Sequence, residues 1–136
     1  MKITLKNNEL VPAINFLESI ELSTKDSRHR TKLIKRIREA LIELSDEEKS
    51  LMEKFNLLDE NGQLKDSKEQ DIKDVAIFNK EQAILLNEEV VIEGGMYARN
   101  FDEIPRILEE YDGMISGKDA EIYDRLLDEF EKEAVE

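Results

Sequence analysis

Apolar residues recur every three or four positions along most of the chain, a spacing that places them on one face of an α-helix. A first helix is predicted near residues 9–20, with Asn8 as its cap. A much longer helix is predicted from about residue 24 to residue 58. Its apolar positions alternate steps of three and four, broken only by Glu48, which is typical of a coiled-coil seam: Ile34, Ile37, Leu41, Leu44, Leu51, Phe55 and Leu58.

A turn-forming segment at residues 59–63 separates this helix from a second long one, which runs to about residue 88. Two long helices joined by a short connection are expected to fold back on each other as an antiparallel hairpin. The second helix also carries Ile77 and Ile84 on another face, so we expect it to contact two layers. The second contact could lie within the domain or in a homo-oligomer, and the sequence leaves both open.

Two short segments have the pattern of β-strands. Residues 2–6 alternate polar with apolar or β-branched side chains, and residues 90–92 are β-branched in succession before a Gly-Gly stop. We expect them to pair as a ribbon that leans on helices, since two strands alone are marginally stable. Two further helices are predicted, one through Pro105 that is capped by Asn100 or Asp102, and a last one with the apolar stripe Tyr123, Leu126, Leu127, Phe130 and Ala134.

The predicted fold class is therefore mainly α: an antiparallel long-helix hairpin with shorter packed helices and a small two-stranded β ribbon. Its 136 residues suit one domain, residues 1–136, with a single core. The absence of cysteine excludes disulfides, thiolate metal sites and cysteine nucleophiles. No apolar run approaches the length of a membrane span, and the first residues lack the apolar segment of a signal peptide, so we expect no membrane partner.

Positive charge gathers in one stretch of a chain whose formal net charge is -13. The candidate partner-binding site consists of Arg28, Arg30, Lys32, Lys35 and Arg36. Arg28, Lys32, Lys35 and Arg36 fall on the outer side of the predicted seam. Cations near a helix N-terminus oppose the helix dipole, and like charges four residues apart repel each other. Such a cluster is either neutralised within the fold, by an acidic ladder on the last helix (Glu121, Asp124, Asp128 and Glu131), left to solvent, or used to dock an acidic partner or a phosphate group.

The sequence offers little catalytic chemistry. His29 is the only histidine, which excludes His-based metal sites and a Ser-His-Asp arrangement. Gly62 lies in a segment that lacks the ligand spacing of a calcium loop, and Gly94 and Gly95 lack the pattern of a phosphate loop. We therefore expect no enzymatic activity, no metal and no cofactor. Direct binding to nucleic acid is also disfavoured, because the overall charge repels phosphates.

Three stretches carry a resemblance to a known family: MKITLKNNEL at the start, LLNEEVVIEGG at residues 85–95 and DAEIYDRLLDEFE at residues 119–131. Together they resemble a family of small acidic proteins of unknown function encoded by phages and prophages of low-GC Gram-positive bacteria. The resemblance implies a setting in the bacterial cytoplasm during infection or in the virion. It transfers no functional residue.

Two functions fit these observations. The first is a non-enzymatic protein–protein interaction module of phage or prophage origin, with a role in assembly or as an adaptor. The alternative is an acidic inhibitor of a host or competing nucleic-acid-binding enzyme, which would present carboxylates in place of phosphates, as a nucleic-acid mimic or anti-defence protein does. A mimic requires carboxylates gathered along one surface.

Overall fold

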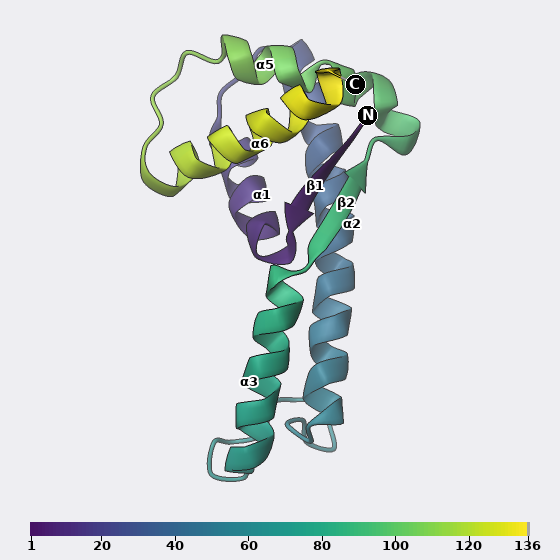
Figure 1. The fold of residues 1–136 in the computed structure, drawn as a ribbon, viewed down its shortest axis with the longest axis vertical. Helices are drawn as coiled ribbons and strands as arrows, with labels where there is room; N and C mark the ends of the chain where they lie inside the picture. The colour runs from purple at the N-terminus through teal and green to yellow at the C-terminus, as the bar shows by residue number, and fades with distance from the viewer. Residues whose placement is uncertain (136) are drawn as a thin grey trace.

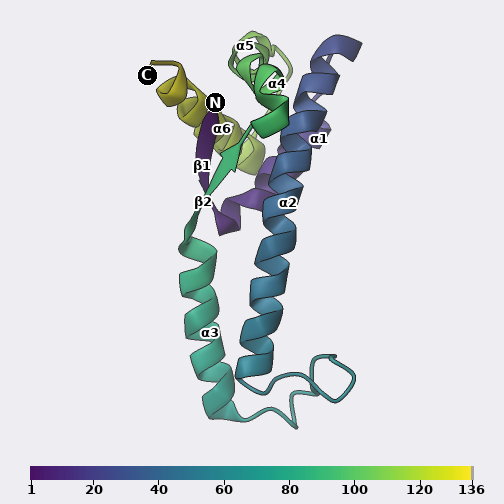
Figure 2. The ribbon, with the colours of Figure 1, turned by 90° about the vertical axis from the view of Figure 1, so that its right-hand side faces the viewer.

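The computed structural model describes residues 1–135 and shows a head from which a two-helix arm projects (Figure 1). We call the arm the part that contains residues 45–88, and the head everything else. Figure 2 shows the arm extending well below the head, with the connection between its helices at the far end. The elements in chain order are β1 (Lys2–Lys6), η1 (Asn7–Glu9), α1 (Leu10–Ser19), α2 (Thr24–Lys54), α3 (Ile72–Asn87), β2 (Glu89–Glu93), η2 (Gly95–Tyr97), α4 (Ala98–Asp102), α5 (Ile104–Glu110) and α6 (Gly117–Val135).

The two strands form the predicted ribbon. They pair antiparallel in a register that places Lys2 opposite Glu93 and Leu5 opposite Val90. Ile3 and Leu5 of β1 and Ile92 of β2 are buried, because the alternation of side chains turns them towards the helices. The ribbon therefore joins the start of the chain to the segment after α3, and the mainly α fold with a small β ribbon is confirmed.

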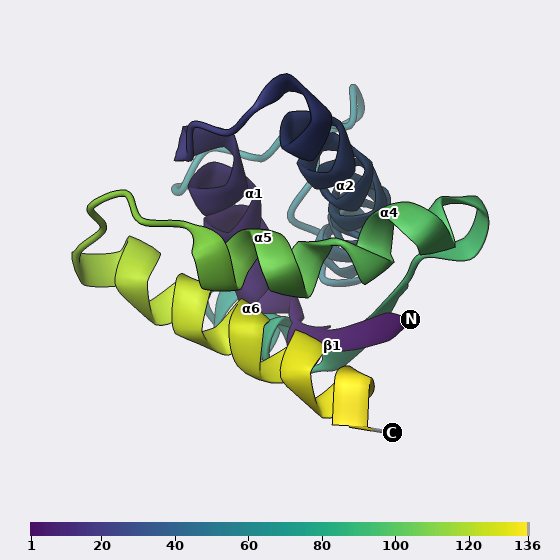
Figure 3. The ribbon, with the colours of Figure 1, turned by 90° about the horizontal axis from the view of Figure 1, so that it is seen from above.

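The core of the head lies between β1, α1, the first half of α2, α5 and α6. Seen from above, α5 and α6 lie side by side (Figure 3), and α1 packs against both α2 and α6. Phe16 and Phe130 are fully buried, and each meets another aromatic ring edge to face. The apolar stripe of α6 was correctly predicted as far as the side chains are described; Ala134 is helical, but its side chain lies outside the described part.

The apolar seam of α2 is buried to different extents along its length. Ile34, Ile37 and Leu44 are buried, whereas Leu41 and Leu51 are only partly buried. The helix ends at Lys54, four residues earlier than predicted, and Asn56 then adopts a left-handed backbone with φ 58°. Leu58 consequently lies outside the helix, in a bridge to Leu64.

In the arm, α3 runs antiparallel to the second half of α2, as predicted (Figure 2). Phe78 and Leu85 face the seam and are buried. Glu48, which interrupts the apolar pattern, accepts a hydrogen bond from Nε2 of Gln82 at 2.8 Å. The polar residue in the seam of α2 therefore has a polar partner on α3. Ile77 and Ile84 remain 48% and 51% exposed, so no part of residues 1–135 supplies the second layer expected for α3.

Two predicted helix starts are wrong. Asn8 lies inside the 3-10 turn η1, and α1 begins at Leu10 without a side-chain cap. The helix with Pro105 in its first turn begins at Ile104 after Glu103, because a separate short helix, α4, already occupies residues 98–102. In both places the predicted cap lies inside a short helical segment: Asn8 in η1, and Asn100 and Asp102 in α4.

Candidate functional site on the basic face of the long helix

All five candidate residues lie in the first half of α2, which is packed against α1 and α4. The helix begins after Ser23, whose Oγ accepts the backbone N–H of Asp26 at 3.3 Å. Arg28 and Lys35 are exposed, and Lys32 and Arg36 are partly buried. We call the surface formed by Arg28, Lys32, Lys35 and Arg36 the basic face.

Arg30 has a role inside the fold. Its Nη1 donates to the carbonyl oxygens of Leu17, at 2.9 Å, and Ile20, at 2.6 Å, at the end of α1. The last carbonyls of a helix lack partners within that helix, and a cation there also complements the helix dipole. Arg30 therefore stabilises the junction between α1 and α2, and its guanidinium is occupied.

Tyr97, from η2, lies between two cations of the basic face. The Nζ of Lys32 lies 5.0 Å from the centre of its ring and the Cζ of Arg36 lies 5.2 Å from it. Both distances are typical of cation–π contacts. Arg36 also pairs with Glu39 at 3.0 Å, while its Nε is buried and has no hydrogen-bond partner in the described chain.

Gly95 lets the Arg36 guanidinium come this close. It has a positive φ of 53°, and a Cβ added there would lie only 2.5 Å from Nη2 of Arg36. Glycine is the residue that adopts this backbone without strain, and here it also leaves the space that the guanidinium fills. The Gly-Gly stop that we read as a strand end thus also shapes the basic face.

The acidic ladder of α6 does not neutralise the basic face. Within residues 1–135, no ion pair joins α2 to α6, and Arg28, Lys32 and Lys35 form no ion pair at all. The acidic residues of that ladder are exposed instead. Of the three readings of the basic stretch, internal pairing with α6 is therefore wrong.

Other charges of the head are well paired. The guanidinium of Arg106 donates to Asp26 at 2.8 Å, and this hydrogen bond is the main reason that the pKa of Asp26 lies below its usual range. Glu129 is 8% exposed and accepts from Arg125, Lys132 and the backbone N–H of Thr4. Burial alone would raise the pKa of Glu129, but these donors outweigh it and lower the pKa.

His29 faces α4. Its Nδ1 lies 3.1 Å from Nδ2 of Asn100, and its Nε2 is buried without a partner in the described chain. His29 thus fastens α4 to α2 beside the basic face.

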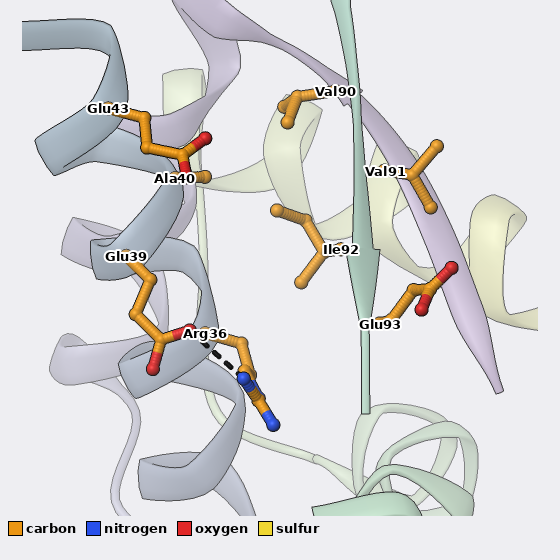
Figure 4. Close-up of a pocket in the computed structure, with 8 residues that line it drawn as sticks. All are labelled: Arg36, Glu39, Ala40, Glu43, Val90, Val91, Ile92 and Glu93. Carbon is orange, nitrogen blue, oxygen red and sulfur yellow. Dashed lines mark hydrogen bonds and ion pairs between the residues drawn. The ribbon is translucent and has the colours of Figure 1, made fainter. Parts of the chain in front are cut away.

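A surface pocket of about 240 Å³ opens next to Arg36, between α2 and β2. Figure 4 shows Val90 and Ile92 pointing from β2 towards α2, opposite Ala40, Glu39 and Glu43, with Arg36 at one end. Its chemistry is that of a contact surface, with an apolar floor, carboxylates and one cation. No group of three or more His, Asp or Glu residues in the described part of the chain is placed to hold a metal ion.

In a comparison with models of protein families, residues 1–135 match a family described as "Protein of unknown function (DUF1617)". The chain belongs to this family. No curated protein and no solved structure matches it. Family membership therefore adds no functional residue to those that the geometry singles out in this member of DUF1617.

No helix within residues 1–135 combines the length and the apolar composition needed to cross a bilayer. The residues that reasoning from the sequence missed in this DUF1617 protein are Tyr97 and Gly95. Their contacts with the basic face come from packing of η2 against α2, which are about 60 residues apart in sequence, and no spacing rule brings them together.

Proposed function

We propose that the protein is a non-enzymatic protein–protein interaction module whose basic face docks an acidic surface of a partner protein. The chain has 33 Asp or Glu against 20 Lys or Arg, so carboxylates are abundant. Arg28, Lys32 and Lys35 nevertheless form no ion pair within the described chain. This observation carries the proposal, since the like-charge repulsion on α2 is left to be compensated from outside.

The arrangement suits a partner with clustered carboxylates. Cations on the rim of an interface mainly raise the association rate and select the partner, while aromatic residues supply contact area. The basic face has both, since Tyr97 lies among its cations. Nucleic acid is a poorer partner for this face. It extends beyond the small basic face, and the negative charge of the rest of the chain repels its phosphates there.

The resemblance to phage and prophage proteins gives the proposal its setting. We place the protein in the cytoplasm of an infected bacterium or in the virion, with a role in particle assembly or as an adaptor. The test is recovery of a partner with a tagged chain from cells producing phage, followed by reconstitution with that purified partner. Replacement of Arg28, Lys32 and Lys35 by Glu is expected to weaken binding about tenfold or more and to abolish its salt dependence.

The matched control reverses three exposed or partly exposed lysines of the arm: Lys65, Lys68 and Lys73. It changes the net charge by the same amount and should leave the affinity within about twofold. Equal loss in both variants would show that net charge alone governs binding, and would reject the basic face as the docking surface.

The alternative function, an acidic inhibitor of a nucleic-acid-binding enzyme, is favoured by one feature. Glu39, Glu43 and Glu47 repeat every four residues on α2, about 6 Å apart along the helix axis. A regular row of carboxylates is what a nucleic-acid mimic requires. Recovery of a nuclease or polymerase, with inhibition that disappears on changing these three residues to Gln, would favour this function over the first.

A further inference from the structure

The pocket beside Arg36 is the upper end of a longer groove that follows the arm. A second hollow adjoins it and shares Ala40, Glu43 and Val90 with it. A third shares Glu47 and Glu88 with the second. The hollows therefore follow one another between α2 on one side and β2 and α3 on the other, the two sides seen next to each other in Figure 2.

The second and third hollows combine an apolar floor with acidic walls. Leu44, Leu51, Ile84, Leu85 and Val90 supply the apolar surface. The charged residues that line these two hollows are all glutamates: Glu43, Glu47, Glu81, Glu88 and Glu89. Within residues 1–135 these five carboxylates form no ion pair.

The floor of the groove is incompletely covered. Ile84 is 51% exposed and Leu51 is only partly buried, because the arm is a single layer of two helices. A groove between two antiparallel helices is the place where a third helix packs in a bundle, through residues spaced at i, i+3, i+4 and i+7. The stretch of α2 from residue 40 to residue 51 spans about 17 Å, which matches three turns of such a helix.

We propose that this groove binds a basic amphipathic helix of a partner protein. The apolar side of that helix would cover Leu51, Ile84 and Leu85, and Lys or Arg residues along its edges would face the glutamate walls. The glutamate walls favour a partner helix that carries positive charge. The apolar floor requires that one side of this partner helix be free of charged residues.

A second copy of this chain fits the groove poorly. A two-fold contact uses the same patch on both molecules, so it would oppose Glu47 and Glu81 to the same carboxylates of the other copy. The basic face of another copy would supply charge of the right sign. The basic face, however, has no row of exposed apolar residues beside its cations on α2. It would therefore leave the apolar floor of the groove uncovered.

The test uses a designed peptide of about 18 residues made of Leu and Lys, with Leu at the spacing of one helix face. A control peptide has the same composition with its Leu residues distributed around the helix. Fluorescence anisotropy at physiological ionic strength is expected to show 1:1 binding of the first peptide, about tenfold tighter than binding of the second.

Two variants locate the site. Changing Glu47, Glu81 and Glu88 together to Gln, or Ile84 to Ser, is expected to weaken binding of the first peptide about tenfold. The control variant changes Glu53, Glu60 and Glu109 to Gln, exposed acids that do not line the groove, and should leave the affinity within about twofold. Circular dichroism of each variant establishes that the helices are retained.

Three results would overturn the proposal. Equal affinity for the two peptides would show attraction by charge alone, and equal weakening by the control variant would place the site elsewhere. Light scattering that gives the mass of two chains for the unmodified protein, and of one chain for Ile84→Ser, would assign the groove to a second copy.

Discussion

The head and the arm bury their apolar side chains to different extents. Only three of the buried apolar residues, Leu57, Phe78 and Leu85, belong to the arm, and all the others belong to the head. Large apolar side chains that stay exposed include four in the arm: Leu64, Ile72, Ile77 and Ile84. A helix in the head packs against several neighbours, whereas α3 packs mainly on α2 and on η1.

The comparison predicts that the head is the more stable of the two regions. The head has a continuous core that includes three fully buried phenylalanines, and buried apolar area is the main source of stability. The arm has one seam, which is covered from one side only. Regions with few buried contacts open locally at a lower free energy than the whole molecule, so the arm is the part of the fold that a partner can most easily stabilise.

The largest expected effect comes from the core of the head. Phe16 is fully buried and its ring meets that of Tyr123 edge to face at 5.9 Å. Phe16→Ala removes most of this buried surface and leaves a cavity, so we expect a loss of about 3–5 kcal/mol in the free energy of unfolding. Urea denaturation measures it, with Val11→Ala, at a 46% exposed position on the same helix, as a control expected to cost far less. A loss below about 1 kcal/mol for Phe16→Ala would mean that the head is not the stable region.

A smaller and more local effect is expected in the arm. Phe78 is 7% exposed and lies outside the core cluster of the head, so Phe78→Ala should cost about 2–3 kcal/mol, at or below the low end for such a change. Hydrogen exchange is expected to accelerate in residues 72–87 and to stay unchanged in α5 and α6. Ile77→Ala, on the exposed side of the same helix, is the control. Equal acceleration in α6 would show that the head and the arm unfold as one unit.

The same contrast explains which predictions from the sequence succeed. The ribbon pairing and the antiparallel hairpin follow from local signals: β-branched runs that stop at glycine, and two long apolar patterns separated by turn-forming residues. The connection is longer than predicted, because α2 ends at Lys54 and α3 begins only at Ile72. The second contact layer of α3 could not be settled in this way, because periodicity shows that Ile77 and Ile84 share a face but not what covers it. The mainly α class and membership of a family of unknown function were correct. The phage origin and the function remain proposals.

The basic stretch shows a second limit of the sequence. In the sequence Arg30 is one more cation of the basic stretch, and only the position of α1 shows that its guanidinium binds the last carbonyls of α1. The acidic ladder of α6 seemed a natural partner, yet α6 packs mainly on α1, α5 and β1 and forms no described ion pair with α2. The sequence shows which cations need a partner of opposite charge or a hydrogen-bond acceptor, but only the tertiary structure shows which group takes that place.

The smallest predicted effect concerns the charges that fasten the ribbon of the head to α6. Glu129 accepts the backbone N–H of Thr4 at 3.0 Å and pairs with Arg125 and Lys132, and its pKa is lowered in the folded chain. A carboxyl group with a lowered folded pKa contributes stability above its unfolded pKa, and loses that contribution as the pH falls through the folded value. Glu129→Gln is therefore expected to cost about 1–2 kcal/mol at neutral pH, because one buried charged acceptor becomes neutral.

The difference between Glu129→Gln and the original chain should shrink as the pH drops below about 4.5, where the carboxyl group of the unfolded chain becomes protonated. Urea denaturation at a series of pH values measures the difference. The control is Glu60→Gln, at an exposed turn of the arm, for which we expect little change at any pH. A cost for Glu129→Gln that persisted unchanged into acid would mean that the shape of the side chain, and not its charge, holds β1 against α6. In that case packing, and not charge, would hold the ribbon of the head in place, as packing holds the two helices of the arm together.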